Sequence, residues 1–247
     1  MAVKTTVVSG WSPTGYAEYG KRFAETFDRH WPASIDLIVY VWEPTWLPRG
    51  VAAIMPTEVS GFLHRHHDNK KANGREYVQG WRLKHIKSGY CFRFDAVKFC
   101  HMAMYPWHAA RMVKDGILVW LDGDVVTFKD IPEGFVDGLL GNADVAYLGR
   151  AGAHSEIGFT AYRLPAALPL LKRFHDLYSF DDVFKLREWH SAFCFDAARR
   201  EFEKQGLRTR DLTPNGFGHT WVRSPLAQYL DHLKGKRKAL GKSPERV

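Results

Sequence analysis

A run of apolar residues that ends in two aspartates is the feature that most constrains how this chain can fold. Residues 117–121 are all apolar, Gly116 precedes them, and Asp122-Gly123-Asp124 follows. Such a run, bounded by turn residues, is typical of a strand buried on both faces. Carboxylates at its end lose hydration unless a cation, hydrogen-bond donors or water replaces it. The pattern therefore predicts either a divalent cation at Asp122 and Asp124 or an ordinary Asp-Gly turn.

The segments around this run predict alternating strands and helices. A β-type run at 5–9 is followed by a turn and by aromatic residues at helical spacing from 16 to about 30. Residues 35–41 and 51–55 are the next strand candidates. This βαβ order favours an α/β fold with a mixed, mostly parallel sheet flanked by helices, in a single domain over 1–247. Further strands are predicted at 143–148 and 156–162, an extended segment at 125–132, and helices at 59–69, 94–114, 135–140, 166–178 and 191–205.

Composition limits the partners of the chain. No stretch has the apolar length of a membrane span, and residues 1–6 lack a signal peptide's apolar core, so we expect a cytoplasmic protein without stable membrane insertion. Cys91, Cys100 and Cys194 lack the spacing of a disulfide framework or a zinc knuckle. The net charge of +8 suits a phosphate-rich ligand as well as a solvated surface. Nine tryptophans add surface on which sugars or bases can stack.

The aspartate pair and a second motif near the carboxyl end together resemble the GT-A glycosyltransferases. A βαβ half followed by a strand ending in Asp-Gly-Asp matches the DxD motif with which these enzymes hold Mn²⁺ or Mg²⁺ against a nucleotide-sugar diphosphate. His232, Gly235 and Lys238 match the HxxGxxK motif of glycogenin and the bacterial lipopolysaccharide galactosyltransferases. The resemblance implies a metal-dependent glycosyltransferase with a GT-A (Rossmann-like) fold, in which Asp122, Asp124 and His232 bind the metal.

The same resemblance implies roles for residues elsewhere in the chain. Gly235 and Lys238 would lie against the donor diphosphate, and the basic segment 232–247 would close a donor site for a nucleotide sugar such as a UDP-sugar. Glu156 stands where the family has an acidic or amide residue lining the sugar, so Glu156 and Asp124 are the catalytic candidates. The resemblance also suggests further donor-site residues, for each of which simple packing or an exposed charge is the alternative interpretation. These further donor-site candidates are Ser9, Tyr16 or Tyr19, Arg93 and Lys98.

Two classes of acceptor remain open at the level of the sequence. In size, charge and its RFDAVKF and SEIGF stretches, the chain resembles bacteriophage enzymes that glycosylate 5-hydroxymethylcytosine in DNA. This resemblance implies a double-stranded DNA partner, a flipped base stacked on Trp189 or Trp221, and His190 and Asp196 near the accepted hydroxyl. The alternative enzyme acts on a saccharide, lipid-linked or protein acceptor. A third hypothesis is a nucleic-acid-binding module whose Asp-Gly-Asp is only a turn.

Overall fold

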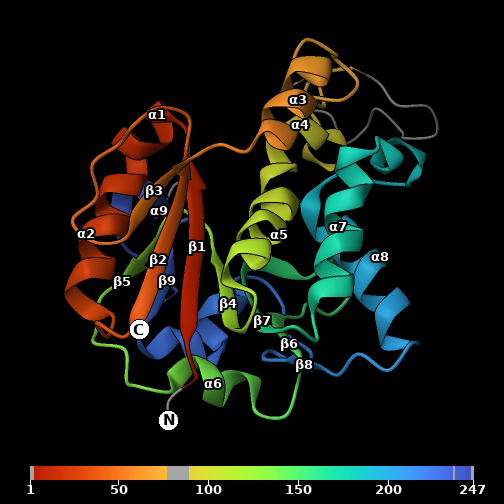
Figure 1. Cartoon of the computed structure of the whole chain (residues 1–247). Coiled ribbons are helices and arrows are strands. Elements are labelled where there is room, and N and C mark those ends of the chain that lie inside the picture. The colour runs from red at the N-terminus through yellow and green to blue at the C-terminus, as the bar shows by residue number, and fades with distance from the viewer. Residues whose placement is uncertain (1–2, 77–88, 236, 246–247) are drawn as a thin grey trace.

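The fold is built on a mixed sheet with helices on both faces (Figure 1). The computed structural model describes residues 3–76, 89–235 and 237–245, and among these the sheet has seven strands in the order β3-β2-β1-β4-β7-β6-β8. All neighbouring strands are parallel except the two pairs made by β7, which confirms the predicted sheet. The strands are β1 (Thr5–Trp11), β2 (Ile35–Val41), β3 (Val51–Ile54), β4 (Gly116–Leu121), β6 (Val145–Leu148), β7 (Glu156–Leu164) and β8 (Thr209–Asp211).

Helices bury both faces of the sheet. In the described residues they are α1 (Pro13–Gly15), α2 (Lys21–His30), α3 (Thr57–His66), α4 (Ala96–Phe99), α5 (His101–Val113), α6 (Phe135–Leu140), α7 (Leu168–Ser179), α8 (Ser191–Glu203) and α9 (Arg237–Leu240). α2 and α6 pack on one face, and α5, α7 and α8 pack on the other (Figure 1). Within β4, Leu118 and Trp120 belong to the core beneath α5, whereas Ile117, Val119 and Leu121 belong to the core beneath α2. Burial on both faces explains why β4 is apolar throughout.

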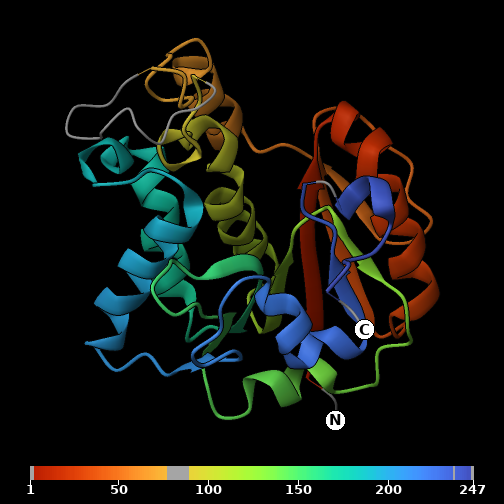
Figure 2. The same cartoon turned by 180° about the vertical axis from the view of Figure 1, so that it is seen from behind.

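A short antiparallel pair brings the carboxyl-terminal part of the chain to the end of β4. The two strands are β5 (Val125–Thr127) and β9 (Leu230–His232), and Val125 lies opposite His232. Seen from behind, this segment lies beside α2 (Figure 2), which packs against β5. Because Val125 follows Asp124 directly, the register places His232 next to the Asp-Gly-Asp turn.

The structure differs from the sequence expectations mainly in its short elements. The helix predicted from 16 begins earlier, because α1 and a π-helical turn (Tyr16–Gly20) lead into α2 without a break. The segment predicted as one helix at 94–114 is divided into α4 and α5. β8 and β9 were not predicted, since three residues are too few to show an alternating pattern. None of the helices in the described residues is long and apolar enough to cross a membrane.

Candidate functional site

Four side chains from three distant segments meet at the carboxyl end of β4. Asp122 and Asp124 follow β4, Glu156 begins β7, and His232 ends β9. The ligand atoms of Asp122, Glu156 and His232 lie within 4.8 Å of one another. Asp124 Oδ1 lies 2.9 Å from His232 Nε2, although these residues are 108 positions apart in the sequence. The pairing of β5 with β9 therefore assembles the two predicted motifs into one site.

The two ring nitrogens of His232 have different acidic neighbours. Its Nε2 lies 2.9 Å from Asp124 Oδ1 and 3.5 Å from Asp122 Oδ2. Its Nδ1 is buried, has no hydrogen-bond partner among the described residues, and lies 3.9 Å from Glu156 Oε1. Both aspartates thus lie near Nε2, whereas Glu156 lies nearer Nδ1.

Neighbouring groups fix these side chains in place. The Trp120 indole N–H donates to Asp122 Oδ1 at 3.0 Å, and the Leu233 backbone N–H donates to the Asp124 carbonyl at 3.0 Å. Gly158 in β7 lies against the imidazole, and a Cβ at this position would come within 2.8 Å of His232 Cε1. The sequence therefore needs a glycine here, because any side chain would displace the histidine.

Cations surround the acidic groups. Lys238 Nζ lies 3.3 Å from Asp124 Oδ2, and Lys234 Nζ lies 3.6 Å from Glu156 Oε2. Arg150 Nη2 lies 3.5 Å from the same Glu156 oxygen. Lys234 and Lys238 are partly exposed on one short segment, so both can reach an anion that approaches the cluster.

The pKa values of the cluster reflect competition between burial and charge. Burial would lower the pKa of His232, but Asp124, Glu156 and Asp122 outweigh it and raise the pKa to about 9. Burial would raise the pKa of Asp124, yet the charges of His232 and Lys238 hold it well below its usual range. Burial raises the pKa of Asp122 despite the charge of His232. Without a metal ion, a proton on His232 balances part of the negative charge of the carboxylates. A bound cation would take over this role.

A cavity of 240 Å³ lies beside the cluster, at the carboxyl ends of β1 and β2. Its lining includes Trp11, Tyr19, Trp42 and Lys98. Tyr19 connects the cavity to the cluster, because Lys238 Nζ lies 4.1 Å from the centre of its ring. Burial, together with the charges of Asp124 and Asp122, raises the pKa of Tyr19 to about 12, so its hydroxyl remains protonated at neutral pH. Aromatic walls and one cation suit a nucleoside.

The structure brings only some of the predicted donor-site residues to this cavity. Lys98 lines it, but Ser9 is fully buried, and its hydroxyl has no hydrogen-bond partner in the part of the chain that the structure describes. The Tyr16 hydroxyl lies 3.5 Å from the Trp46 carbonyl, and Tyr19 rather than Tyr16 lines the cavity. Arg93 Nη1 lies 3.0 Å from a Glu188 oxygen instead of facing the cavity.

The predicted glycine and lysine of the second motif lie on the turn that follows β9. Gly235 has a φ of 63°, in the left-handed region that glycine adopts without strain. Lys238 lies on α9 and reaches back to Asp124 across Tyr19. The turn at Gly235 thus returns the chain toward the aspartates.

The predicted acceptor residues are buried in the structure. Trp189 is only 7% exposed, and its ring packs edge-on against Phe94 and Phe184, so it is not an open stacking platform. Trp221 is also fully buried, as expected for an indole in the core beneath α2. A large apolar ring gains more from burial than from exposure, and the sequence gives no local sign of which occurs.

His190 and Asp196 are likewise buried rather than open to an acceptor. His190 Nε2 lies 3.0 Å from Glu188 Oε2. Asp196 accepts hydrogen bonds from the Ser155 backbone N–H and hydroxyl, at 3.0 and 2.6 Å. Asp196 therefore supports the segment that precedes Glu156, whereas His190 is held by Glu188.

Three residues of this region were missed by reasoning from the sequence. Trp42 is 52% exposed and lines the cavity directly after β2, so an aromatic residue just past a parallel strand was the available signal. Lys234 lies two residues after His232, inside the motif. Arg150 lies between two strands, and its approach to Glu156 has no sequence signal.

Comparison with known proteins bears on the fold. No protein-family profile matches the sequence, and no curated protein matches it. Among solved structures, it is similar to a glycosyltransferase involved in the glycosylation of the major capsid of PBCV-1, with a TM-score of 0.51 and 13% identity over 96% of this chain and 97% of the other. Mouse xyloside xylosyltransferase 1 in its apo form matches with a TM-score of 0.48 and 11% identity over 91% of each chain. The first likeness shows that the chain shares its fold with a glycosyltransferase, as predicted.

Proposed function

We propose that the protein is a metal-dependent glycosyltransferase that moves a sugar from a nucleotide sugar to a hydroxyl group. The observation that supports this most is the convergence of Asp122, Asp124 and His232 Nε2 at the carboxyl end of a parallel strand. Ligands of open α/β sheets bind outside this end of the strands. Two lysines and an aromatic cavity adjoin the three groups, as a nucleoside diphosphate requires.

The residues present fit a divalent cation. Two carboxylates and an imidazole would hold it, because an oxygen of each aspartate approaches the same nitrogen, His232 Nε2, at 2.9 Å for Asp124 and 3.5 Å for Asp122. Glu156, 3.9 Å from Nδ1, adds negative charge beside the histidine. When bound, Mn²⁺ or Mg²⁺ neutralises negative charge that develops on the diphosphate as the sugar leaves.

The other groups of the site have distinct proposed roles. The cavity between Trp42 and Tyr19 takes the nucleoside, most simply the uridine of a UDP-sugar, by stacking against its rings. Lys238 binds the diphosphate oxygens, and to reach them it gives up its ion pair with Asp124. Glu156 orients the transferred sugar, and its approach to Lys234 and Arg150 keeps it ionised, because these cations, with His232, outweigh burial and lower its pKa.

The finer proposal for the acceptor is 5-hydroxymethylcytosine in double-stranded DNA. It is supported by the sequence resemblance and by the net charge of +8, which suits a phosphate backbone. Because Trp189 and Trp221 are buried, the stacking contact would fall to an exposed ring such as Trp46, which is 75% exposed. A saccharide, lipid-linked or protein hydroxyl is the alternative acceptor.

The proposal is tested by supplying nucleotide sugars, including UDP-sugars, with Mn²⁺ or Mg²⁺ and measuring release of nucleoside diphosphate. We expect release from at least one donor, loss of release in chelator, and recovery when the ion is restored. No release from any donor with either ion would contradict the proposal. Hydroxymethylated DNA, unmodified DNA and simple saccharides are added as separate acceptors. Labelling of a saccharide but of no DNA would exclude the DNA acceptor and leave the transferase standing.

Lys238→Met is expected to weaken binding of a nucleoside diphosphate by about tenfold to 100-fold. A charge-assisted hydrogen bond contributes about 1.5–3 kcal/mol, and each 1.4 kcal/mol corresponds to about tenfold in affinity. Affinity for Mn²⁺ alone should not fall, because the substitution removes a cation 3.3 Å from Asp124. Calorimetric titration measures both affinities. The control is Lys242→Met, which removes an exposed charge on the same basic segment. Equal nucleotide affinity in the two variants would show that Lys238 does not contact the nucleotide.

A further inference from the structure

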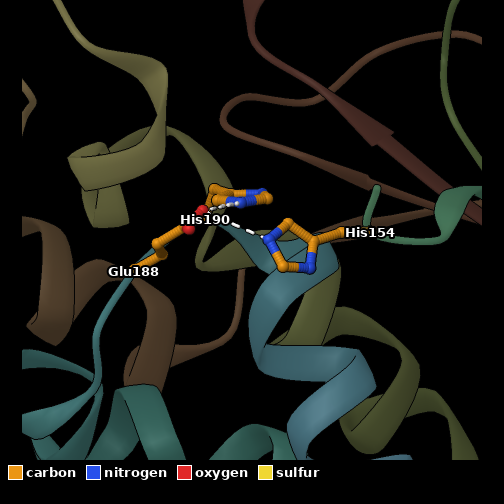
Figure 3. A group of neighbouring side chains, drawn as sticks. All are labelled: His154, Glu188 and His190. Carbon is orange, nitrogen blue, oxygen red and sulfur yellow. Dashed lines mark hydrogen bonds and ion pairs between the residues drawn. The ribbon is translucent and has the colours of Figure 1, made fainter. Parts of the chain in front are cut away.

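A second cluster of metal-binding side chains lies outside the site described above. It consists of His154, on the segment before β7, and Glu188 and His190, just before α8 (Figure 3). Figure 3 shows the Glu188 carboxylate reaching toward both rings. His154 Nε2 and His190 Nε2 lie 3.3 and 3.0 Å from the same oxygen, Glu188 Oε2. The three groups converge although His154 is separated from the others by β7 and α7.

These separations match the ligands of a tetrahedral metal ion. Zinc bonds of about 2.0–2.1 Å to nitrogen and carboxylate oxygen place neighbouring ligands about 3.3 Å apart. The remaining Glu188 oxygen, Oε1, is engaged by Arg93 at 3.0 Å and by Arg187 at 3.6 Å. This arrangement fixes the carboxylate and leaves Oε2 directed at the two histidines.

The surroundings of His154 favour a metal over a simple hydrogen-bonded cluster. If neutral His154 donated its Nε2–H to Glu188, its Nδ1 lone pair would face Asp196 Oδ2, which lies 3.8 Å away. Two acceptors would then face each other with no proton between them. With a metal on Nε2, the proton lies on Nδ1 and faces the Asp196 carboxylate, which resembles the carboxylate–histidine–metal arrangement of zinc sites. Asp196 is itself held by Ser155 and Arg199.

We propose that His154, Glu188 and His190 bind a second divalent ion that prefers nitrogen ligands, such as Zn²⁺. Two imidazoles and one carboxylate suit zinc, whereas Mg²⁺ prefers oxygen ligands. Glu188 and His190 are 1% and 5% exposed, so the rigid part of the site is already assembled in the core. The third ligand, His154, is more exposed and provides the route of entry.

The second ion would tie together the segments that position Glu156. His154 lies two residues before Glu156, whereas Glu188 and His190 are anchored by backbone hydrogen bonds from Trp189 and His190 to the Arg93 carbonyl. Binding would therefore hold the segment before β7 against the start of α8. Three protein ligands also leave a fourth position for water.

The test is the zinc stoichiometry of metal-free protein after titration with Zn²⁺ and removal of unbound ion. We expect two zinc ions per chain in the parent, because the metal site proposed above at Asp122 should also accept zinc. His154→Gln and Asp122→Asn should each retain one, and the double variant should retain none. Glu188→Gln is the second variant of the new site and should also retain one. Replacing Zn²⁺ by Co²⁺ should give visible absorption typical of tetrahedral cobalt, which His154→Gln loses and Asp122→Asn keeps.

The controls separate this site from others and from misfolding. His67→Gln removes a histidine with a 74% exposed side chain and should leave both ions bound. Thermal unfolding in chelator checks that each variant is folded. If His154→Gln and Glu188→Gln both bind as much zinc as the parent, the cluster is a hydrogen-bonded one and the proposal is wrong. If only Asp122→Asn binds as much as the parent, the second site stands and the metal at the first is excluded.

Discussion

Asp124→Asn is expected to reduce metal-dependent sugar transfer by at least about 100-fold while the protein remains folded. Removing a single group that stabilises transition-state charge typically costs about 10²–10³ in rate, and this change removes an anionic ligand of the ion that we propose does so. Asparagine has nearly the same shape as aspartate, so it can pack 2.9 Å from His232 in the same way. What it lacks is the negative charge. Steady-state release of nucleoside diphosphate with saturating Mn²⁺ measures the effect.

The matched control is Asp130→Asn, which alters an aspartate with an 86% exposed side chain that pairs with His30 at the end of α2. Its turnover should equal that of the parent. Thermal unfolding of both variants separates a loss of chemistry from a loss of structure. Unchanged metal-dependent turnover by Asp124→Asn would show that the aspartate pair is a turn and not a metal site.

Gly158→Ala is expected to weaken Mn²⁺ binding by about 10- to 100-fold although it changes no ligand. The new Cβ would lie 2.8 Å from His232 Cε1 and 3.1 Å from Asp122 Oδ2, so the imidazole and the carboxylate must move apart. Substitutions of groups that orient metal ligands commonly cost 10- to 100-fold in affinity or activity. Crowding of a packed core typically costs about 1–3 kcal/mol as well, so the unfolding temperature should also fall.

Gly138→Ala provides the control for this prediction. Gly138 lies in α6, and a Cβ there would meet no atom of the described residues within 4 Å. Alanine should therefore leave metal binding unchanged and stabilise the helix slightly. Electron paramagnetic resonance of free Mn²⁺ measures binding in both variants without relying on turnover. Equal affinity in parent and Gly158→Ala would mean that His232 is not a ligand in the arrangement described.

The predicted fold class agrees with the structure because its signals are local. Residues 35–41 were predicted as a strand, and β2 has the same bounds. The helix at 135–140 likewise coincides with α6. In both segments the apolar pattern is set by burial against neighbouring elements, so it can be read before those neighbours are known. β8 and β9 are too short to carry such a pattern.

The candidate site was only partly predictable. Asp122, Asp124 and His232 stand out because charged or ligating residues at the end of a buried strand, or within a spaced motif, are visible in the sequence. The acceptor residues were chosen from resemblance and aromatic character, and Trp189 proved to be buried. Exposure depends on what packs over a side chain, which local sequence does not specify.

The sequence by itself determined the buried strand, the α/β order and the residue types of a cation and diphosphate site, because these follow from local hydrophobic patterns and from the chemistry of single side chains. Only the tertiary structure decided which of those residues meet. Pairing of β5 with β9 brings His232 to Asp124 across 108 residues, and the lack of a side chain at Gly158 leaves room for the ring. The meeting of His154 with Glu188 and His190 was equally invisible beforehand. Such contacts depend on how separate elements pack in space, and the spacing of residues along the chain does not reveal which of them become neighbours.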